Sequence, residues 1–267
     1  MSVIRAFRRL GIPALMYLFL VPCQAQGTAS PAYRQNTGNT NAWLMYFGNH
    51  KFSPLLGWHA EVQIRRHDLI REWQQLLLRT GLDIYSKNVR YTIGYAFVET
   101  YPYGEFPVAH SFPEHRIWQQ ALVSHSTGRL KLSHRYRLEQ RMIGNASAGA
   151  FRNGRFENRF RYMLKGSLPL TGNTLEAKEF FLAAYDEIFI NFGKGVRYNL
   201  LDQNRAYAAL GFHLGKIGKL ECGFLYQVLQ QGSLIQTGMD TFNKIENNFT
   251  FQLGLFSDLS FYKTPKD

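Results

Sequence analysis

Cysteine is almost absent from this sequence, which has two, Cys23 and Cys222, among 267 residues. Cys23 lies in an N-terminal stretch with the features of a secretory signal peptide, so we expect Cys222 to stand alone in the mature chain. One thiol can form neither an intramolecular disulfide nor a cysteine-bound metal cluster. Long apolar runs are also absent after this stretch. Without about 18 consecutive apolar residues, the chain cannot be a membrane protein of transmembrane helices.

Acidic residues are scarce as well: 19 Asp and Glu oppose 31 Lys and Arg, a formal net charge of +12. Such an excess can indicate nucleic-acid binding, but here the cations are dispersed along the chain, and we expect no nucleic-acid partner. The usual catalytic motifs are missing too. No His-x-Ser pattern occurs, and Gly193-Lys194-Gly195 lacks the spacing of a phosphate-binding loop. We expect no catalytic residue, no metal site and no cofactor.

Residues 1–25 are expected to be a cleaved signal peptide. Three arginines precede an apolar stretch over 10–21, and Cys23-Gln24-Ala25 forms a small-x-small cleavage site. Cleavage would remove those three arginines and no acid, which leaves 28 basic against 19 acidic residues and a net charge of +9. We therefore expect an exported protein that begins at Gln26.

The stretch 130–168 alternates between apolar and ionic side chains with few exceptions. Leu132, Leu138, Phe160 and Leu164 fall on one parity, and the other parity is mainly Arg, Lys and Glu. Because successive side chains of a β-strand point to opposite faces, this pattern predicts two strands, each apolar on one side and ionic on the other. Both are longer than the roughly 5–6 residues of an ordinary strand and suit the roughly 9–11 of a transmembrane strand.

The ionic parity is informative because Arg and Glu cannot be packed singly into a dry interior, whereas they can line a wet channel as compensating ladders. We predict that the apolar parity faces lipid and that the ionic parity lines the lumen of a barrel. In the later run 178–192 we assign Glu187 to the lumen, paired with Arg159 or Arg161, and Asp186 to the outer face. The predicted lumen-lining ladder comprises Arg135, Arg137, Glu139, Arg141, Glu157, Arg159, Arg161, Lys165 and Glu187.

Eleven runs with strand periodicity follow residue 41, each bounded by turn chemistry. They cover residues 42–50, 57–67, 71–84, 88–100, 114–125, 129–142, 156–168, 178–192, 203–215, 218–231 and 244–258. Aromatic residues make up 15% of the chain, which fits the girdles of a membrane barrel. No linker or repeat divides the runs. We therefore expect a single all-β, antiparallel up-and-down transmembrane β-barrel over 42–267.

Connections of different length are expected at the two ends of this barrel, as in outer-membrane barrels. The short ones lie at 86–88, 126–128 and 216–218, and the long ones at 101–113, 143–155 and 232–243. With a periplasmic C-terminus, eleven strands would leave the mature N-terminus on the outer side. Two solutions remain open: the segment 26–41 contains a weak strand, which gives 12 strands within a predicted range of 10–12, or it threads the lumen.

Seven motifs along the mature chain carry a resemblance to a known family. They are Asn41-Ala42-Trp43, His59–Gln63, Gln75–Gly81, His134–Arg141, Asp186–Phe192, Asp202–Arg205 with Gly211 beyond it, and Gly223–Tyr226. In these the chain resembles the DUF2490 outer-membrane barrels of Gram-negative bacteria, which are common in the Bacteroidota. The resemblance implies a barrel located in the outer membrane. It implies no catalytic role, because the biochemical activity of that family is unassigned.

The predicted function is that of a non-enzymatic outer-membrane barrel in contact with lipid. It is either a narrow pore or a binding protein for an envelope component or a small solute, with a small anionic solute as a candidate. A hydrolase acting on lipid is an alternative, but Ser124-His125 and Ser133-His134 are adjacent pairs whose side chains would point to opposite faces of a strand. A soluble exported β-sandwich is the third interpretation of the sequence.

Overall fold

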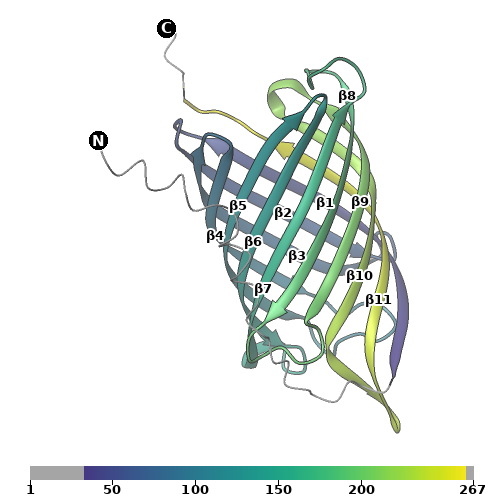
Figure 1. Ribbon diagram of the computed structural model, residues 1–267. Coiled ribbons are helices and arrows are strands. Elements are labelled where there is room, and N and C mark those ends of the chain that lie inside the picture. Colours follow the sequence, from purple (N-terminus) through teal and green to yellow (C-terminus); the bar gives the residue numbers. More distant parts are fainter. Residues whose placement is uncertain (1–32, 263–267) are drawn as a thin grey trace, which may run out of the picture. The chain divides into compact units, whose positions relative to one another are not determined.

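The computed structural model describes residues 33–262, which form a closed barrel of eleven β-strands (Figure 1). The strands are β1 Arg34–Lys51, β2 Leu56–His67, β3 Glu72–Ser86, β4 Val89–Thr100, β5 Phe112–Thr127, β6 Leu130–Asn145, β7 Ala150–Pro169, β8 Phe180–Phe192, β9 Leu201–His213, β10 Lys219–Thr237 and β11 Asp240–Ser257. Each of the eleven predicted runs corresponds to one of these strands. No helix within 33–262 has the length and apolar character to cross a membrane. The predicted signal peptide lies outside the described residues.

The barrel closes between its first and last strands, which run parallel, with Ala42 opposite Phe251 and Leu44 opposite Leu253. All other neighbouring strands are antiparallel. The described barrel is complete with eleven strands, which lies within the predicted range of 10–12 and is one fewer than the favoured twelve. The structure also places residues 34–41 in the first part of β1, instead of in a separate weak strand or a lumen segment. Because the strand number is odd, β1 and β11 run in the same direction, and the start of β1 lies at the end of the barrel opposite to the end of β11, as expected for eleven strands.

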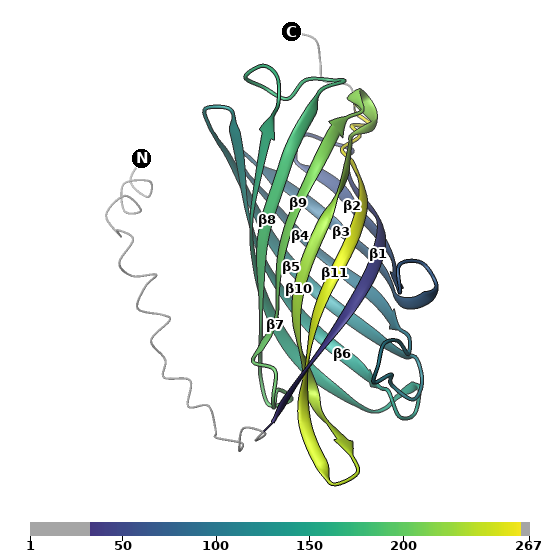
Figure 2. The ribbon, with the colours of Figure 1, turned by 90° about the vertical axis from the view of Figure 1, so that its right-hand side faces the viewer.

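Connections lie at two ends of the barrel: the N-terminal end, where β1 begins, and the C-terminal end, where β11 finishes (Figure 2). The predicted tight turns after β3, β5 and β9 all lie at the C-terminal end. The predicted long loops 143–155 and 232–243 are wrong, because strands continue through most of both and satisfy their backbone groups by pairing. The loop 101–111 is long as predicted, but 170–179 at the opposite end is long too. Loop length therefore does not separate the two ends.

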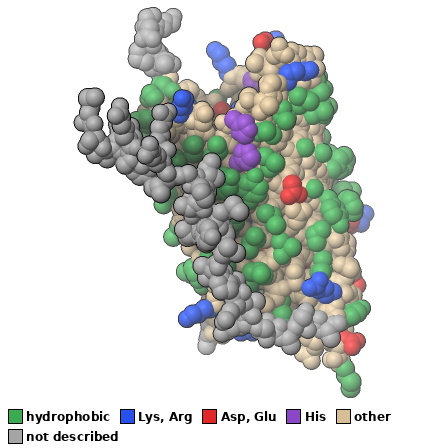
Figure 3. All heavy atoms as spheres, viewed as in Figure 1, with side chains coloured by type: hydrophobic (Ala, Val, Ile, Leu, Met, Phe, Trp, Pro, Cys, Tyr) green, Lys and Arg blue, Asp and Glu red, His purple; other side chains and the backbone are tan. Residues whose placement is uncertain are grey.

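The two faces of the wall differ in chemistry. Large apolar side chains are exposed on the outside of strand after strand, for example Leu44, Leu82, Ile117, Leu182 and Phe251. Figure 3 shows such side chains spread over the barrel wall, with few charged groups between them. The opposite parity of the same strands is buried and largely polar or charged. The barrel thus has an apolar exterior and a polar interior.

Glycines make room inside the barrel for a tryptophan that supports the charged groups. Gly81 of β3 and Gly94 of β4 pair directly, and Gly94 pairs with Trp118 of β5 on its other side. A Cβ atom at Gly94 would lie 2.1 Å from the backbone oxygen of Thr80, so no larger residue fits there without a shift. Trp118 is fully buried, and a Cβ atom added at Gly81 would lie 3.2 Å from its ring. The aromatic ring provides a surface against which arginine side chains can pack.

Candidate functional site

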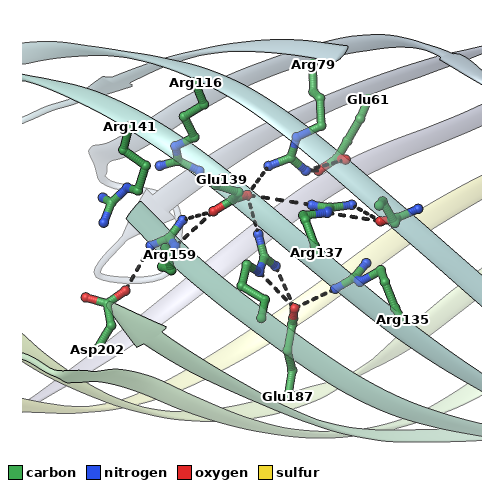
Figure 4. A network of polar contacts seen from close by, with 12 residues as sticks. Glu61, Arg79, Arg116, Arg135, Arg137, Glu139, Arg141, Arg159, Glu187 and Asp202 are labelled. Atoms are coloured by element: carbon green, nitrogen blue, oxygen red, sulfur yellow. Dashed lines mark hydrogen bonds and ion pairs between the residues drawn. The ribbon is translucent and has the colours of Figure 1, made fainter. Parts of the chain in front are cut away.

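Glu139 of β6 lies at the centre of an ion-pair network inside the barrel (Figure 4). It has no solvent exposure. Arg159 of β7 donates to its Oε2 from Nε at 2.9 Å and from Nη2 at 2.5 Å. Arg161 and Arg79 donate to its Oε1 at 2.9 and 3.3 Å. Because β3, which carries Arg79, is not a neighbour of β6, the last bond crosses the bore of the barrel.

The three arginines connect Glu139 to further carboxylates. Arg79 donates to both oxygens of Glu61 on β2, at 2.8 and 2.6 Å. Arg161 donates to Glu187 of β8 from Nε at 2.9 Å, and Arg159 donates to Asp202 of β9 at 2.8 Å. The result is one continuous network contributed by β2, β3, β6, β7, β8 and β9. Such mutual pairing is what buried charges require.

A second group of ion pairs lies nearer the N-terminal end. Glu114 of β5 accepts hydrogen bonds from Arg116 at 2.6 and 2.9 Å and from Arg141 of β6 at 2.6 and 3.1 Å. Glu157 of β7 accepts from Arg155 at 2.6 Å and from Arg141 at 3.4 Å. Arg141 therefore joins the two carboxylates. This group lies on one side of the bore, along the neighbouring strands β5, β6 and β7.

The structure places all nine residues of the predicted ladder on the inner parity of their strands. Pairing of β6 with β7 sets Arg137 opposite Arg161, Glu139 opposite Arg159 and Arg141 opposite Glu157. Glu187 contacts Arg161 as predicted and also Arg135, whose Nη2 donates at 2.8 Å. The ladder is not one continuous unit, however.

Two residues of the ladder, and Asp186 next to Glu187, have their main contacts with residues outside the ladder. Lys165 pairs with Glu221 of β10 at 2.5 Å, and Arg137 donates mainly to Gln120 of β5, at 3.0 and 2.6 Å. Asp186 faces outward, where Asn204 of β9 donates to its carboxylate at 3.1 Å. Of these partners, Glu221 belongs to a strand that is not a neighbour of β7, so the sequence does not place it beside Lys165.

Sequence reasoning missed five buried members of the two groups of ion pairs. Glu61, Arg79, Glu114, Arg116 and Asp202 are buried members that the predicted ladder does not include. The alternation of Glu61, Gln63 and Arg65 on β2 was a usable signal for the first of them. Asp202 was not predictable by parity, because a register irregularity in the β8–β9 pair turns it inward.

Aromatic rings support several guanidinium groups of the interior. The ring of Trp118 lies 5.3 Å from Arg79 and 4.8 Å from Arg137, measured from the guanidinium carbon to the ring centroid. Phe189 of β8 supports Arg161 in the same way, at 4.2 Å. These contacts hold long side chains in place and add a favourable electrostatic term.

Two chambers lie within the bore, on either side of the network. The N-terminal chamber is lined mainly by arginines and amides, and the C-terminal chamber has one wall with Met45, Phe47 and Phe256. Four side chains line both chambers, and they are Trp43, Gln63, Arg161 and Arg205. We call this shared layer, with the Glu139 network, the septum. Its side chains lie between the two chambers.

The loop 101–111 contributes to the mouth of the N-terminal chamber through Tyr103. The Tyr103 hydroxyl donates to Glu246 of β11 at 3.3 Å. Burial, followed by the nearby negative charge of Glu246, raises the pKa of Tyr103 well above its usual value. Tyr103 therefore remains a protonated donor throughout the physiological range and ties this loop to the opposite wall.

The serine and histidine pairs considered for hydrolysis are divided by the wall. Ser124 and Ser133 lie on the inner parity and are hydrogen-bonded to each other at 3.1 Å. His125 and His134 lie on the outer parity with their rings stacked at 5.4 Å. Within residues 33–262, no group of three or more His, Cys, Asp or Glu side chains is placed to hold a metal ion. This geometry offers no serine with a histidine base beside it.

Comparison with known proteins places the chain in a family without an assigned activity. No curated protein and no solved structure matches it. A family model described as "Protein of unknown function (DUF2490)" matches residues 40–237, from within β1 to the end of β10. This match covers most of the barrel and agrees with the resemblance of its motifs. The chain therefore belongs to the DUF2490 family.

Proposed function

We propose that this protein is an outer-membrane barrel with a closed lumen, which binds a small anionic solute instead of acting as an open channel. The observation that carries the proposal is the septum: the Arg79–Glu139 bond crosses the bore between strands that are not neighbours. Narrow barrels are filled by their own side chains, whereas porins of about 16–18 strands leave an aqueous channel. Eleven strands with long, paired inward side chains belong with the narrow type.

The distribution of side chains supports a membrane location. A soluble β-sandwich buries its apolar parity between two sheets and exposes its ions. Here the apolar parity is on the outside around the barrel and the ions are inside, which is the arrangement of outer-membrane barrels. Outward Asp186 is partnered by Asn204, which reduces the cost of a carboxylate on that face.

Heat-modifiable gel migration together with outer-membrane fractionation tests the location. The folded barrel should fractionate with outer-membrane markers and migrate differently before and after boiling. Recovery in the soluble periplasmic fraction would overturn the membrane proposal.

Planar-bilayer recording tests the closed lumen. The purified barrel should pass small ions poorly, with a preference for anions because cations exceed carboxylates along the bore. A large, persistently open, cation-selective conductance would contradict both the closed septum and the anionic ligand.

A further inference from the structure

Two buried arginines line the N-terminal chamber without an acidic partner. Arg65 of β2 and Arg205 of β9 are 9% and 8% exposed. Neither has a carboxylate oxygen within 4.0 Å among residues 33–262, whereas Arg116, Arg141 and Arg159 in the same chamber all do. A buried charge without a counter-charge is costly. The interior therefore holds positive charge that the described chain does not neutralise.

These two guanidinium groups are held close to one ring. The guanidinium carbons of Arg65 and Arg205 lie 4.1 and 5.1 Å from the ring of Trp43. Arg65 donates to Gln63 at 3.0 and 2.6 Å and to Gln75 at 2.7 Å. Amide oxygens position a guanidinium group but leave its charge in place. Arg65 uses three of its five N–H donors in these bonds, so two remain for a ligand.

Arg205 has fewer hydrogen-bond partners than Arg65. When the amide of Gln227 is oriented with its oxygen toward Arg205, that oxygen accepts from Nε and Nη2 at 3.2 Å. Arg205 also lines both chambers, so its charge faces the bore from within the septum. Its N–H groups are therefore available to a ligand that enters the N-terminal chamber.

The surroundings favour a small hydrophilic ligand over an aromatic one. The ring of Trp43 is occupied by the two arginines, and that of Phe189 by Arg161 and Arg205 at 4.2 and 4.8 Å. Several other lining groups are amides, among them Gln74, Gln75, Asn199, Gln203, Gln230 and Gln231. The rings of Trp43 and Phe189 already pack against arginines. A compact, strongly polar group fits this lining.

We propose that Arg65 and Arg205 bind a phosphoryl group, as inorganic phosphate or as the phosphate of a small hydrophilic ester. Two uncompensated positive charges match a dianion, and the N–H edges of guanidinium groups match phosphate oxygens. The proposal deepens the proposed function, on which it rests for the anionic nature of the solute. It assigns that solute to the N-terminal chamber.

Apart from Arg205, which lines both chambers, and the exposed Lys131, the Lys and Arg side chains of the C-terminal chamber have a carboxylate oxygen within 4.0 Å. Among them, Arg135 and Lys165 pair with Glu187 and Glu221 at 2.8 and 2.5 Å. Arg90 lies 3.9 Å from Asp83. Because Arg90 lines this chamber and not the other, it is a matched interior control for a change of charge.

Calorimetric titration of the purified full-length barrel in detergent, at low chloride, tests the site. Inorganic phosphate and glucose 6-phosphate should both bind saturably, and glucose should not. The double variant Arg65→Gln/Arg205→Gln should weaken phosphate binding about tenfold or more, a difference of one decade in Kd. Arg90→Gln should leave it unchanged.

Thermal unfolding without ligand separates loss of the site from loss of the fold. Because the two arginines lack partners, the double variant should be at least as heat-stable as the parent, and phosphate should stabilise only the parent. Unchanged phosphate affinity in the double variant would overturn the proposal, and so would a parent that binds neither phosphate compound. These measurements use the purified barrel. Their result therefore does not depend on whether the protein fractionates with the outer membrane.

Discussion

Glu139 shows how a single residue can organise an interior of charges. Removing two charges from water costs more than an average ion pair returns, so a buried pair adds little net stability. Loss of one partner is another matter, because the remaining charge stays buried and unpaired. Glu139 has three arginine partners, Arg79, Arg159 and Arg161, and no contact with solvent.

The first prediction is therefore that Glu139→Gln destabilises the barrel strongly. We expect a loss of about 3–5 kcal/mol in the free energy of unfolding, the range for breaking a buried ion pair. Urea titration of the barrel in lipid vesicles measures it. Glu105→Gln, a change of an exposed acid in the loop 101–111, is the control and should have almost no effect. An unchanged urea midpoint for Glu139→Gln would show that the network does not stabilise the fold.

Glu157 provides a second prediction, which concerns salt. Its partner Arg155 is half exposed, so the like charges left by Glu157→Gln face partly into water. The loss of stability should be greater at low salt than at high salt, because mobile ions screen exposed repulsion. The loss in Glu139→Gln should depend less on salt, since its partners are buried. Equal losses at both ionic strengths would indicate that Glu157 acts through packing or a direct hydrogen bond.

At the scale of elements, β6 and β7 combine two surfaces in one hairpin. Their register sets Leu138 opposite Phe160 on the outside and Glu139 opposite Arg159 on the inside. A shift of one residue would exchange the two faces and place ions on the outside of the barrel. The strict alternation of this hairpin thus fixes its register as well as its secondary structure.

The third prediction tests the outer face of this hairpin. Leu138→Arg should lower the free energy of unfolding by about 2–4 kcal/mol if the site lies near the midplane of the bilayer. Leu130→Arg, at the first residue of β6 and thus near an end of the barrel, should lower it by about 0–1 kcal/mol. Unfolding titrations in lipid vesicles compare the two variants. Equal, negligible costs with normal insertion would contradict a lipid-facing position for Leu138.

At the scale of the molecule, the septum divides the bore into two chambers of different character. Arg161 is central to that division, because it lines both chambers and joins Glu139 to Glu187. Its guanidinium group occupies space that ions would otherwise cross. Closure thus depends on side chains from several strands and not on a separate plug.

The fourth prediction is that Arg161→Ala opens the bore. Loss of this side chain should raise the single-channel conductance in planar bilayers severalfold, since narrow barrels are closed mainly by their own side chains. Arg90→Ala, which lines only the C-terminal chamber, should stay close to the parent. Heat-modifiable migration must first show that both variants are folded. Equal conductance of the two folded variants would place the closure elsewhere.

The sequence by itself determined the strands, the two faces and the identity of many interior charges. Period-2 alternation is a local property, so the parity of Arg137, Glu139 and Arg159 can be seen without knowing their neighbours. For the same reason, all eleven runs were located. The ends of the strands were predicted less well, because pairing extends β10 and β11 through a stretch whose composition suggests a loop.

Only the tertiary structure decided how the sheet closes and which charges meet. The parallel β1–β11 pair joins segments from opposite ends of the chain, and no local pattern specifies such a pairing. The bonds of Glu139 to Arg79 and of Lys165 to Glu221 depend on the curvature of the closed wall, which brings strands that are not neighbours together across the bore. The absence of acidic partners for Arg65 and Arg205 within 33–262 could likewise not be predicted from the sequence. A lack of partners is a property of three-dimensional surroundings and not of a sequence.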